Sequence, residues 1–443
     1  MRWRVPIAVL LGACAAPPQR AGILVVSLDT LRADRLGAWG STAGLTPNLD
    51  RFAAESVVFD RAFAQSNETL YSHAALFTSR YPDRLDAMDG TFRVPASTPT
   101  LADAFTGAGW ATAGFVAGGH LSRSFGLDRG FAQWDDTSSW GSLRETSALA
   151  LHWLDTRQGE APFFLFVHAY DTHDRYLRPS PFGYAFADPG DQGLGARLGR
   201  TVGGASSVLG GAWTERPDTP ELLAASPRFD HGRAVRELDP TAAPLSEADV
   251  LHLAALYDGA VAWEDACFGR FMAGLDARGL LDRITIVVLS DHGEELGEGG
   301  VFAHRATLDD AVTRVPLMVR LPGGAHGGRR LTGLVELVDV APTLLDLAGV
   351  DAALYGDGQS LVRGIEGGEE VARSTAVSVG ALRLLSVRGP TARLTAEGLS
   401  VDNPHLDALL AVAPLDGVSL RLGGDPAAEP TLRAAMRAYV EAR

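Results

Sequence analysis

The chain has 443 residues, of which 46% are hydrophobic and 21% are charged, so it can bury a large core without being a membrane bundle. Its 54 acidic residues outnumber 39 basic ones, and the resulting net charge of −15 argues against a general role on nucleic acid or anionic lipid. Every basic residue is Arg, which removes Lys from all catalytic roles. We expect one large domain with an appendage, or two domains, and a small or neutral partner.

The first twenty residues predict an export signal followed by a brief tether. Two arginines precede a short apolar run, residues 5–11, that cannot span a bilayer, and small residues follow it. The letters "LGAC" resemble a bacterial lipobox that would leave Cys14 acylated after cleavage, whereas ordinary cleavage within residues 13–15 is the alternative. The expected location is the bacterial cell envelope, as a periplasmic or outer-membrane lipoprotein that Cys14 anchors to the membrane. Cys267 is the only other cysteine, so no intrachain disulfide is expected.

Three continuous apolar runs predict buried strands, at residues 22–29, 162–173 and 284–293. Continuous rather than alternating apolarity indicates a sheet that is covered on both faces. Helix signals lie between the runs, where Thr46 precedes Pro47 and Thr98 precedes Pro99. The predicted fold class is therefore α/β, with a largely parallel central sheet flanked by helices.

The rest of the chain divides by composition. A long helix is predicted from Ser246 to a stop near Gly279, and residues 182–244 before it are rich in Gly, Ala and Pro, which indicates an insertion or lid. Short apolar pieces near the end predict a small C-terminal antiparallel subdomain that finishes in a helix. The expected organisation is a signal and tether at 1–20, a main domain at 21–349 and the subdomain at 350–443.

Side chains that can bind a metal follow each of the three predicted strands. They are Asp29 after the first, His168, Asp171 and His173 after the second, and Asp291 and His292 after the third. Each alone is commonly a turn or capping residue, but ligands of open α/β sheets bind at the carboxyl ends of strands. Oxygen ligands with one imidazole suit Ca²⁺, Mg²⁺ or Mn²⁺, and Zn²⁺ if further histidines join. The sequence thus predicts a metal site here.

Five ordered motifs resemble the sulfatase branch of the alkaline phosphatase superfamily. They are "ILVVSLDTLRADRLGAWG", "TPNLDRFAAESVVFDRAFAQS", "SHAALFTSRYP", "YDGAVAWED" and "VVLSDHGEELGEGG", and they cover residues 23–349, with weaker similarity at "RLGGDPAAE". The resemblance implies one divalent cation, Ca²⁺, Mg²⁺, Mn²⁺ or Zn²⁺. Its implied ligands are Asp29, Asp291 and His292, together with a nucleophile at Thr69.

Thr69 departs from the sulfatase pattern. Authentic sulfatases carry a Cys or Ser followed by x-Pro-x-Arg, which a maturation enzyme converts to formylglycine, but here the letters from Thr69 to His73 are "TLYSH". Oxidation of Thr would give a ketone, so no such maturation enzyme is expected as a partner. Thr69 instead resembles the Thr nucleophile of the superfamily's phosphodiesterases and phospho-headgroup transferases, which a metal would activate. The alternative is that Thr69 only caps a helix that begins near Tyr71 or Ser72.

The resemblance also implies cationic groups that contact the substrate and protonate the leaving group, namely His73, His120, His173 and His304. A solvent-facing or supporting role is the alternative for each. The predicted function is an exported hydrolase of sulfate or phosphate esters of a small molecule, glycan or lipid headgroup, with phosphate better suited to a Thr. The alternatives are a phospho-headgroup transferase and a non-catalytic binding lipoprotein that keeps the fold. A further possibility is a two-metal site in which Asp171, His173 and His304 bind the second ion.

Overall fold

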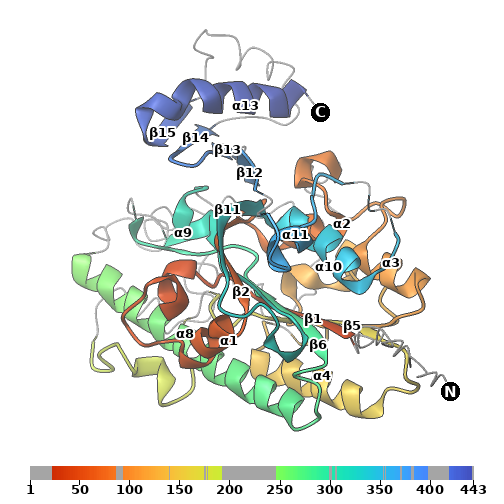
Figure 1. The fold of residues 1–443 in the computed structure, drawn as a ribbon. Coiled ribbons are helices and arrows are strands. Elements are labelled where there is room, and N and C mark those ends of the chain that lie inside the picture. The colour runs from red at the N-terminus through yellow and green to blue at the C-terminus, as the bar shows by residue number, and fades with distance from the viewer. Residues whose placement is uncertain are drawn as a thin grey trace, which may run out of the picture.

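A large mixed sheet forms the centre of the computed structural model (Figure 1). The structure describes residues 22–85, 93–138, 140–173, 176, 178–191, 246–298, 302–304, 307–352, 354, 356–369, 372–380, 384–397 and 419–441. The predicted export signal, Cys14 and most of the predicted insertion lie outside these residues. Within them, no helix combines the length and the apolar character that a membrane crossing requires.

The central sheet has nine strands in the order β11-β2-β10-β6-β1-β5-β3-β4, with β9 paired to β2. Strand β1 pairs in parallel with both β5 and β6, whereas β10 is antiparallel to β6 and β2. The largely parallel α/β sheet predicted from the apolar runs is confirmed. The strand bounds are Gly22–Leu28 (β1), Val57–Phe63 (β2), Ala111–Phe115 (β3), Gln133–Asp135 (β4), Phe163–Ala169 (β5), Ile284–Leu289 (β6), Arg314–Val315 (β9), Leu317–Arg320 (β10) and Arg330–Glu336 (β11).

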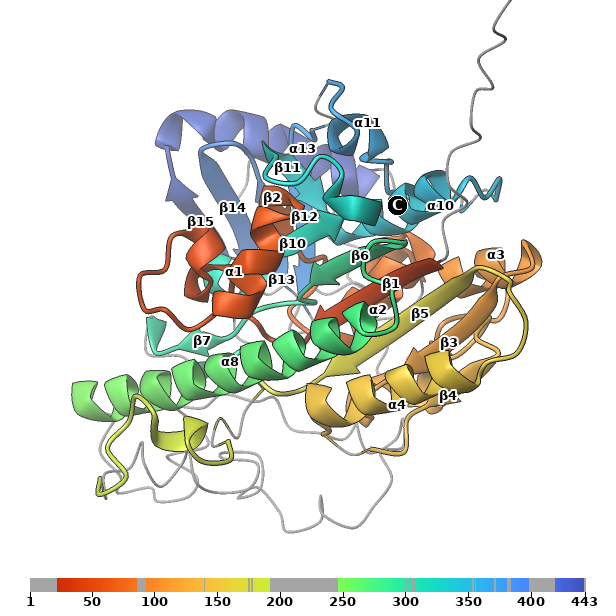
Figure 2. The same cartoon turned by 60° about the horizontal axis from the view of Figure 1, so that its bottom comes forward.

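Helices cover both faces of this sheet, as Figure 2 shows. Successive residues of β1 point to opposite faces, so that Ile23 packs into one hydrophobic core and Leu24 into the other. The first core contains residues of α2 (Thr69–Thr78), α3 (Leu101–Gly107), α10 (Val340–Ala348) and α11 (Val362–Ile365). The second contains residues of α1 (Pro47–Ala54), α4 (Leu143–Thr156) and α8 (Glu247–Asp276). Burial on both sides explains why the strands are apolar throughout.

The helix starts predicted at Pro47 and near Ser246 are confirmed. Helix α1 begins at Pro47 after Thr46, and α8 begins after Ser246, whose hydroxyl accepts the N–H of Asp249 while that carboxylate accepts the N–H of Ser246. The start predicted after Thr98 is wrong, because α3 begins at Leu101. There Thr100 forms the same reciprocal pair of bonds with Asp103, which satisfies two backbone donors at the helix end.

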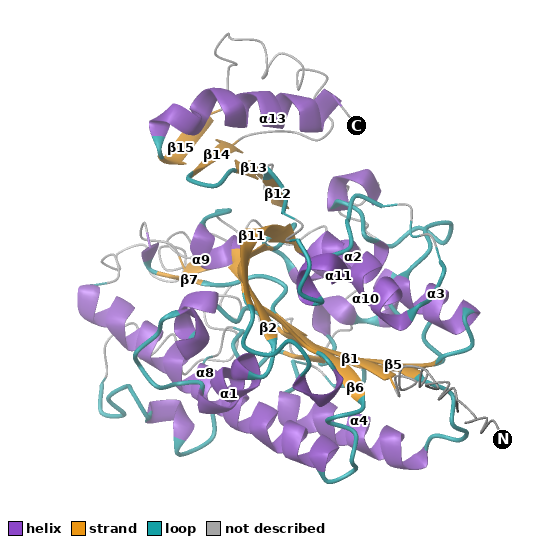
Figure 3. Ribbon diagram, in the orientation of Figure 1, coloured by secondary structure: helices purple, strands orange, loops and turns teal. Residues whose placement is uncertain are grey.

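The C-terminal part forms a separate antiparallel sheet in the order β12-β13-β14-β15, with α13 packed on it (Figure 3). Leu432 and Met436 of α13 share a hydrophobic core with Val387 and Leu394 of the sheet. The predicted antiparallel subdomain with a final helix is therefore confirmed, while its exact boundary stays a prediction. The bounds are Ala376–Gly380 (β12), Leu384–Arg388 (β13), Ala392–Glu397 (β14), Ser419–Gly424 (β15) and Glu429–Glu441 (α13). The remaining short elements are β7 (Glu295–Leu296), β8 (Phe302–Ala303) and α9 (Asp310–Thr313).

Candidate metal centre and active site

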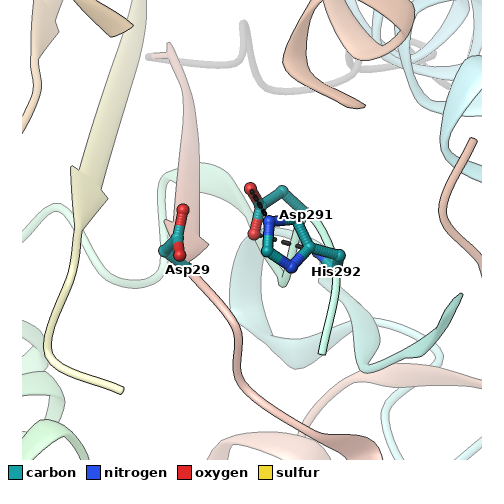
Figure 4. A group of neighbouring side chains, drawn as sticks. All are labelled: Asp29, Asp291 and His292. Atoms are coloured by element: carbon teal, nitrogen blue, oxygen red, sulfur yellow. Dashed lines mark hydrogen bonds and ion pairs between the residues drawn. The ribbon is translucent and has the colours of Figure 1, made fainter. Parts of the chain in front are cut away.

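Two carboxylates and an imidazole meet at the carboxyl ends of β1 and β6. Asp29 follows β1, while Asp291 and His292 follow β6, and all three side chains are buried. One ligand atom of each lies within 4.8 Å of the others. Figure 4 shows Asp29 at the tip of β1 beside Asp291 and His292. Because β1 and β6 are parallel neighbours, their carboxyl ends bring these predicted ligands together.

The donor atoms of this cluster fit a divalent cation. Among the described residues, Asp29 Oδ1 and Asp291 Oδ2 are buried without a hydrogen-bond partner, which is costly unless a positive charge compensates. Burial, and next the charge of Asp29, raise the pKa of the Asp291 carboxyl. His292 Nδ1 lies 2.9 Å from the carbonyl oxygen of Gly293 and must donate to it, so Nε2 presents its lone pair. This arrangement is typical of a histidine that binds a metal.

Thr69 reaches this cluster from the first position of α2. Its Oγ1 atom lies 3.0 Å from Asp29 Oδ2, to which it donates, and 3.3 Å from His292 Nε2. The predicted start of the helix near Tyr71 or Ser72 is wrong, because the helical turn already includes Thr69 and Glu68 is the N-cap. Thr69 therefore does not occupy the capping position, and its hydroxyl points to the carboxylate. The first N–H groups of an α-helix have no partner within the helix, so this helix end suits an anion.

His73 lies one turn further along α2 and is fully buried. Its Nδ1 lies 2.7 Å from the carbonyl oxygen of Thr69, and its Nε2 lies 2.9 Å from the hydroxyl of Ser27 on β1. Nδ1 thus donates to the carbonyl while Nε2 accepts from the hydroxyl. Burial lowers the pKa of His73 to about 4, which keeps the ring neutral at pH 7. Both nitrogens connect protein groups, so His73 joins α2 to β1 behind the cluster.

Three further predicted histidines belong to a series of ring contacts that begins at His292 of the metal cluster. The ring of His304 is centred 4.4 Å from that of His292 and 5.2 Å from that of His173. His173 in turn packs on Trp140, with ring centres 5.0 Å apart. His120 is half-buried in a short 3₁₀ turn, and its ring centre is 6.1 Å from that of Trp140. Contact of these histidines with a substrate stays a prediction.

The sequence analysis missed Tyr170, which immediately follows β5. Its hydroxyl accepts the backbone N–H of His120 at 3.2 Å, and its ring centre lies 4.6 Å from that of His168. Burial, followed by the charges of Asp29 and Asp291, raises the Tyr170 pKa well above its ordinary value, so the phenol stays protonated. A signal was present, because Tyr170 occupies the same strand end as the residues that were considered.

Asp171 has a supporting role. Its Oδ2 accepts the backbone N–H of Leu143 at 2.6 Å, and its Oδ1 accepts Trp263 Nε1–H at 2.8 Å. Both carboxylate oxygens are thus used to connect α4 and α8, which argues against a second metal ion that uses Asp171. His168 lies closer to the cluster, with Nε2 3.4 Å from Asp29 Oδ2, and burial lowers its pKa to about 3. A neutral ring next to Asp29 helps to orient that carboxylate.

Comparison with known proteins agrees with this geometry. The family model described as Sulfatase matches residues 22–350, which is well over half of the chain. The chain belongs to the sulfatase family. The predicted membership, and with it the prediction of a sulfatase-like ester hydrolase, is confirmed at this level.

Individual family members are similar over different lengths. The multifunctional alkaline phosphatase superfamily protein PehA of Trinickia caryophylli is 28% identical over 221 residues, which are 48% of this chain and 39% of that protein. An N-acetylglucosamine-6-O-sulfatase of Bacteroides thetaiotaomicron is 24% identical over 81% of this chain and 74% of its own. The crystal structure of the phosphonate monoester hydrolase of Agrobacterium radiobacter has a TM-score of 0.68 and 21% identity, covering 95% of this chain and 94% of that one. This last similarity establishes the fold.

Proposed function

We propose that this sulfatase-family chain is a metal-dependent hydrolase of sulfate or phosphate esters in which Thr69 is the nucleophile. The observation that carries the proposal is the position of Thr69 Oγ1, within 3.3 Å of both Asp29 and His292 in the buried cluster. A hydroxyl that only capped a helix would bond to a backbone N–H group, whereas that of Thr69 faces Asp29 Oδ2 and His292 Nε2. Asp29, Asp291 and His292 would hold the single cation, whose charge would lower the hydroxyl pKa and neutralise ester oxygens.

The residues around the ester would divide the remaining tasks. Asp29 Oδ2 accepts the proton of Thr69, which leaves the oxygen free to attack phosphorus or sulfur. The first N–H groups of α2 bind the anionic ester oxygens. The neutral phenol of Tyr170 donates a hydrogen bond beside Thr69, and His173 or His304 supplies the proton that the leaving group needs. Water then attacks the phosphorus or sulfur and gives its proton to the same histidine, while the departing Thr69 oxygen regains its proton from Asp29.

The substrate we propose is an anionic ester of a small molecule, glycan or lipid headgroup. Phosphoryl esters rank first, because Thr69 cannot become the formylglycine that the resemblance associates with sulfate cleavage, and no maturation enzyme is required. Among the relatives, one is named for N-acetylglucosamine-6-O-sulfate, which supports an anionic glycan ester. The PehA relative is named multifunctional, which supports testing several ester types in parallel.

A panel of nitrophenyl esters tests the proposal. Purified protein is assayed with phosphate monoester, phosphate diester, phosphonate and sulfate substrates, each with Ca²⁺, Mg²⁺, Mn²⁺ or Zn²⁺ after removal of bound metal. The expected result is turnover of at least one phosphoryl ester that requires added metal. Strong sulfate ester turnover without phosphoryl activity would reverse the substrate ranking, and no turnover by metal-loaded protein would refute the hydrolase.

We also propose that the chain is exported to the bacterial envelope and anchored through Cys14. The support is the pattern of two arginines, a short apolar run and "LGAC" in the first fourteen residues. Labelling with a radioactive fatty acid in the native host should mark the wild-type protein and not Cys14→Ser. Labelling of neither protein, with both recovered as soluble envelope protein, would support ordinary cleavage instead.

A further inference from the structure

A group of arginines lies where the C-terminal sheet meets the central sheet. A cavity of about 490 Å³ opens between β2 and β9 on one side and the β13–β14 hairpin on the other. We call it the arginine cavity, because its lining includes four arginines against one acidic residue, namely Arg61, Arg314, Arg388, Arg393 and Asp310. The arginine cavity is thus lined by positive charge, although the chain as a whole has a net charge of −15.

The single carboxylate of the arginine cavity is shared. Asp310 Oδ1 lies 2.5 Å from Arg388 Nη2 and 3.3 Å from Arg393 Nη1. Only 12% of the Arg388 side chain is exposed, and burial lowers its pKa to about 10, with further lowering by Arg393 and Arg61. Arg393 Nε is buried without a hydrogen-bond partner among the described residues. The cavity therefore has excess positive charge and a donor that is not used.

A neighbouring acid does not remove this excess. Asp309 Oδ1 pairs with Arg393 Nη2 at 2.5 Å, but the same oxygen also pairs with Arg421 Nη2 at 2.8 Å. Two adjacent aspartates thus serve several guanidinium groups. A partly buried cluster of like charges is unfavourable unless an anion completes it.

The guanidinium groups are held in place by the protein. Arg61 Nη2 donates to the carbonyl oxygens of Gly389 at 3.1 Å and Pro390 at 2.9 Å. Arg314 Nη2 donates to the carbonyl oxygen of Asp60 at 2.9 Å. The Arg388 guanidinium lies over the ring of Phe63, 4.5 Å from its centre. Fixed guanidinium groups lose less side-chain entropy when they bind an oxyanion, and their paired donors match its oxygens.

The arginine cavity lies toward the same edge of the sheet as the metal centre. Strand β2 is antiparallel to β10, β10 is antiparallel to β6, and β6 is parallel to β1. Strand β2 therefore runs in the direction of β1. Its last residue, Phe63, lines the cavity at the carboxyl end of β2, just as Asp29 follows the carboxyl end of β1.

We propose that the arginine cavity binds a sulfate or phosphate group at a site distinct from the metal centre. Tetrahedral oxyanions match both the charge and the paired donors. The group would be either a free inorganic ion or a second anionic group of a longer substrate whose ester bond lies at the metal centre. Binding here is measured directly, so it stands or falls independently of the proposed hydrolysis.

Calorimetric titration of metal-loaded protein with inorganic sulfate and phosphate tests this site. Arg388→Gln and Arg393→Gln should each weaken one class of oxyanion sites by roughly 10-fold or more. Arg61→Gln provides a third variant in case the other two fail to fold, because it leaves the ion pairs of Asp309 and Asp310 intact. Arg433→Gln is the matched control, because Arg433 is exposed on α13 and pairs only with Glu429 among the described residues. Hydrolysis of a small aryl ester should be unchanged in all four variants.

Kinetics on a substrate with several sulfate or phosphate groups distinguishes the two sources of the anion. A rise in KM confined to that substrate identifies the bound group as part of the substrate, whereas unchanged kinetics with lost ion binding identifies a free ion. Oxyanion affinity and stoichiometry that are unchanged from wild type in every folded cavity variant would overturn the proposal.

Discussion

The hydroxyl of Thr69 lies 3.0 Å from Asp29 Oδ2, although 40 positions separate the two residues along the chain. The contact exists because Asp29 ends a central strand while Thr69 begins the helix packed against it. Asp29 also carries a buried oxygen, Oδ1, without a hydrogen-bond partner among the described residues. The Asp29 carboxylate can therefore receive the proton of the hydroxyl through Oδ2 and bind a cation through Oδ1.

Replacing Thr69 by Ala should reduce ester turnover roughly 10³-fold or more, because the covalent nucleophile is lost. Thr69→Ser should retain part of the activity, since it keeps the hydroxyl. Thr156→Ala is the control, because Thr156 is exposed and, among the described residues, its hydroxyl bonds only to α4 carbonyl oxygens. Steady-state assays and circular dichroism check activity and folding. Equal turnover by wild type and Thr69→Ala, with neither binding metal tightly, would favour the non-catalytic alternative.

Asp291→Asn should be more stable than wild type without metal and less stable than wild type with metal. Without metal, wild type holds two buried carboxylates close together. The variant should therefore have a free energy of unfolding that is higher by on the order of 1 kcal/mol, and should melt at a higher temperature. With metal, wild type gains binding energy that the variant largely loses, so wild type should melt at the higher temperature. Melting curves in chelator and in excess metal check this.

Asp346→Asn is the matched control for the metal experiment, because Asp346 is exposed on α10. It should respond to metal as wild type does. An Asp291→Asn protein that gains as much from metal as wild type would exclude Asp291 as a ligand.

His73→Phe should lower both stability and kcat while leaving KM almost unchanged. The substitution leaves the Ser27 hydroxyl and the Thr69 carbonyl without their buried partner, which costs about 1–3 kcal/mol. It also loosens the turn that positions the Thr69 hydroxyl. Urea unfolding and steady-state kinetics measure the two effects, with the exposed His152→Phe as control. A rise in KM at normal stability would instead place His73 in contact with the substrate.

Glu295 should make the folded protein less stable as the pH rises from 4.5 to about 7. Burial raises its pKa from 4.5 to about 7, so between these values the folded state retains a proton that the unfolded state has released. Its contribution therefore favours folding most below pH 4.5 and is lost as pH rises to 7, on the order of 3 kcal/mol. Glu295→Gln should remove this dependence in melting curves from pH 5 to 8. Exposed Glu160→Gln should keep it.

Much of the metal cluster follows from the order of the strands. Asp29 and Asp291 could be predicted because each directly follows a continuous apolar run, and parallel strands end at one edge. His73 was different, because its direction depends on where α2 begins. With Thr69 as first helical residue, His73 lies four positions on, under the Thr69 carbonyl; a start two residues later would have changed its surroundings.

The orientation of side chains beside the cluster also needed the three-dimensional structure. Asp171 and Tyr170 are adjacent at the end of β5, yet the carboxylate turns to α4 and α8 while the phenol turns to the backbone N–H of His120. The sequence does not predict which way each side chain points, since both residues directly follow the same strand. The arginine cavity was likewise invisible, because it joins β2 to a hairpin more than three hundred residues later in the chain.

A phenol on helix α8 binds the backbone of the segment that follows β1. The Tyr257 hydroxyl donates to the carbonyl oxygen of Thr30 at 2.7 Å and accepts the N–H of Arg32 at 3.0 Å. The Arg32 amide can therefore exchange its hydrogen with solvent only when α8 moves away or the phenol is lost. The exchange rate of this amide would therefore report how often α8 separates from the backbone next to Asp29. It can be measured by mass spectrometry or NMR without any substrate.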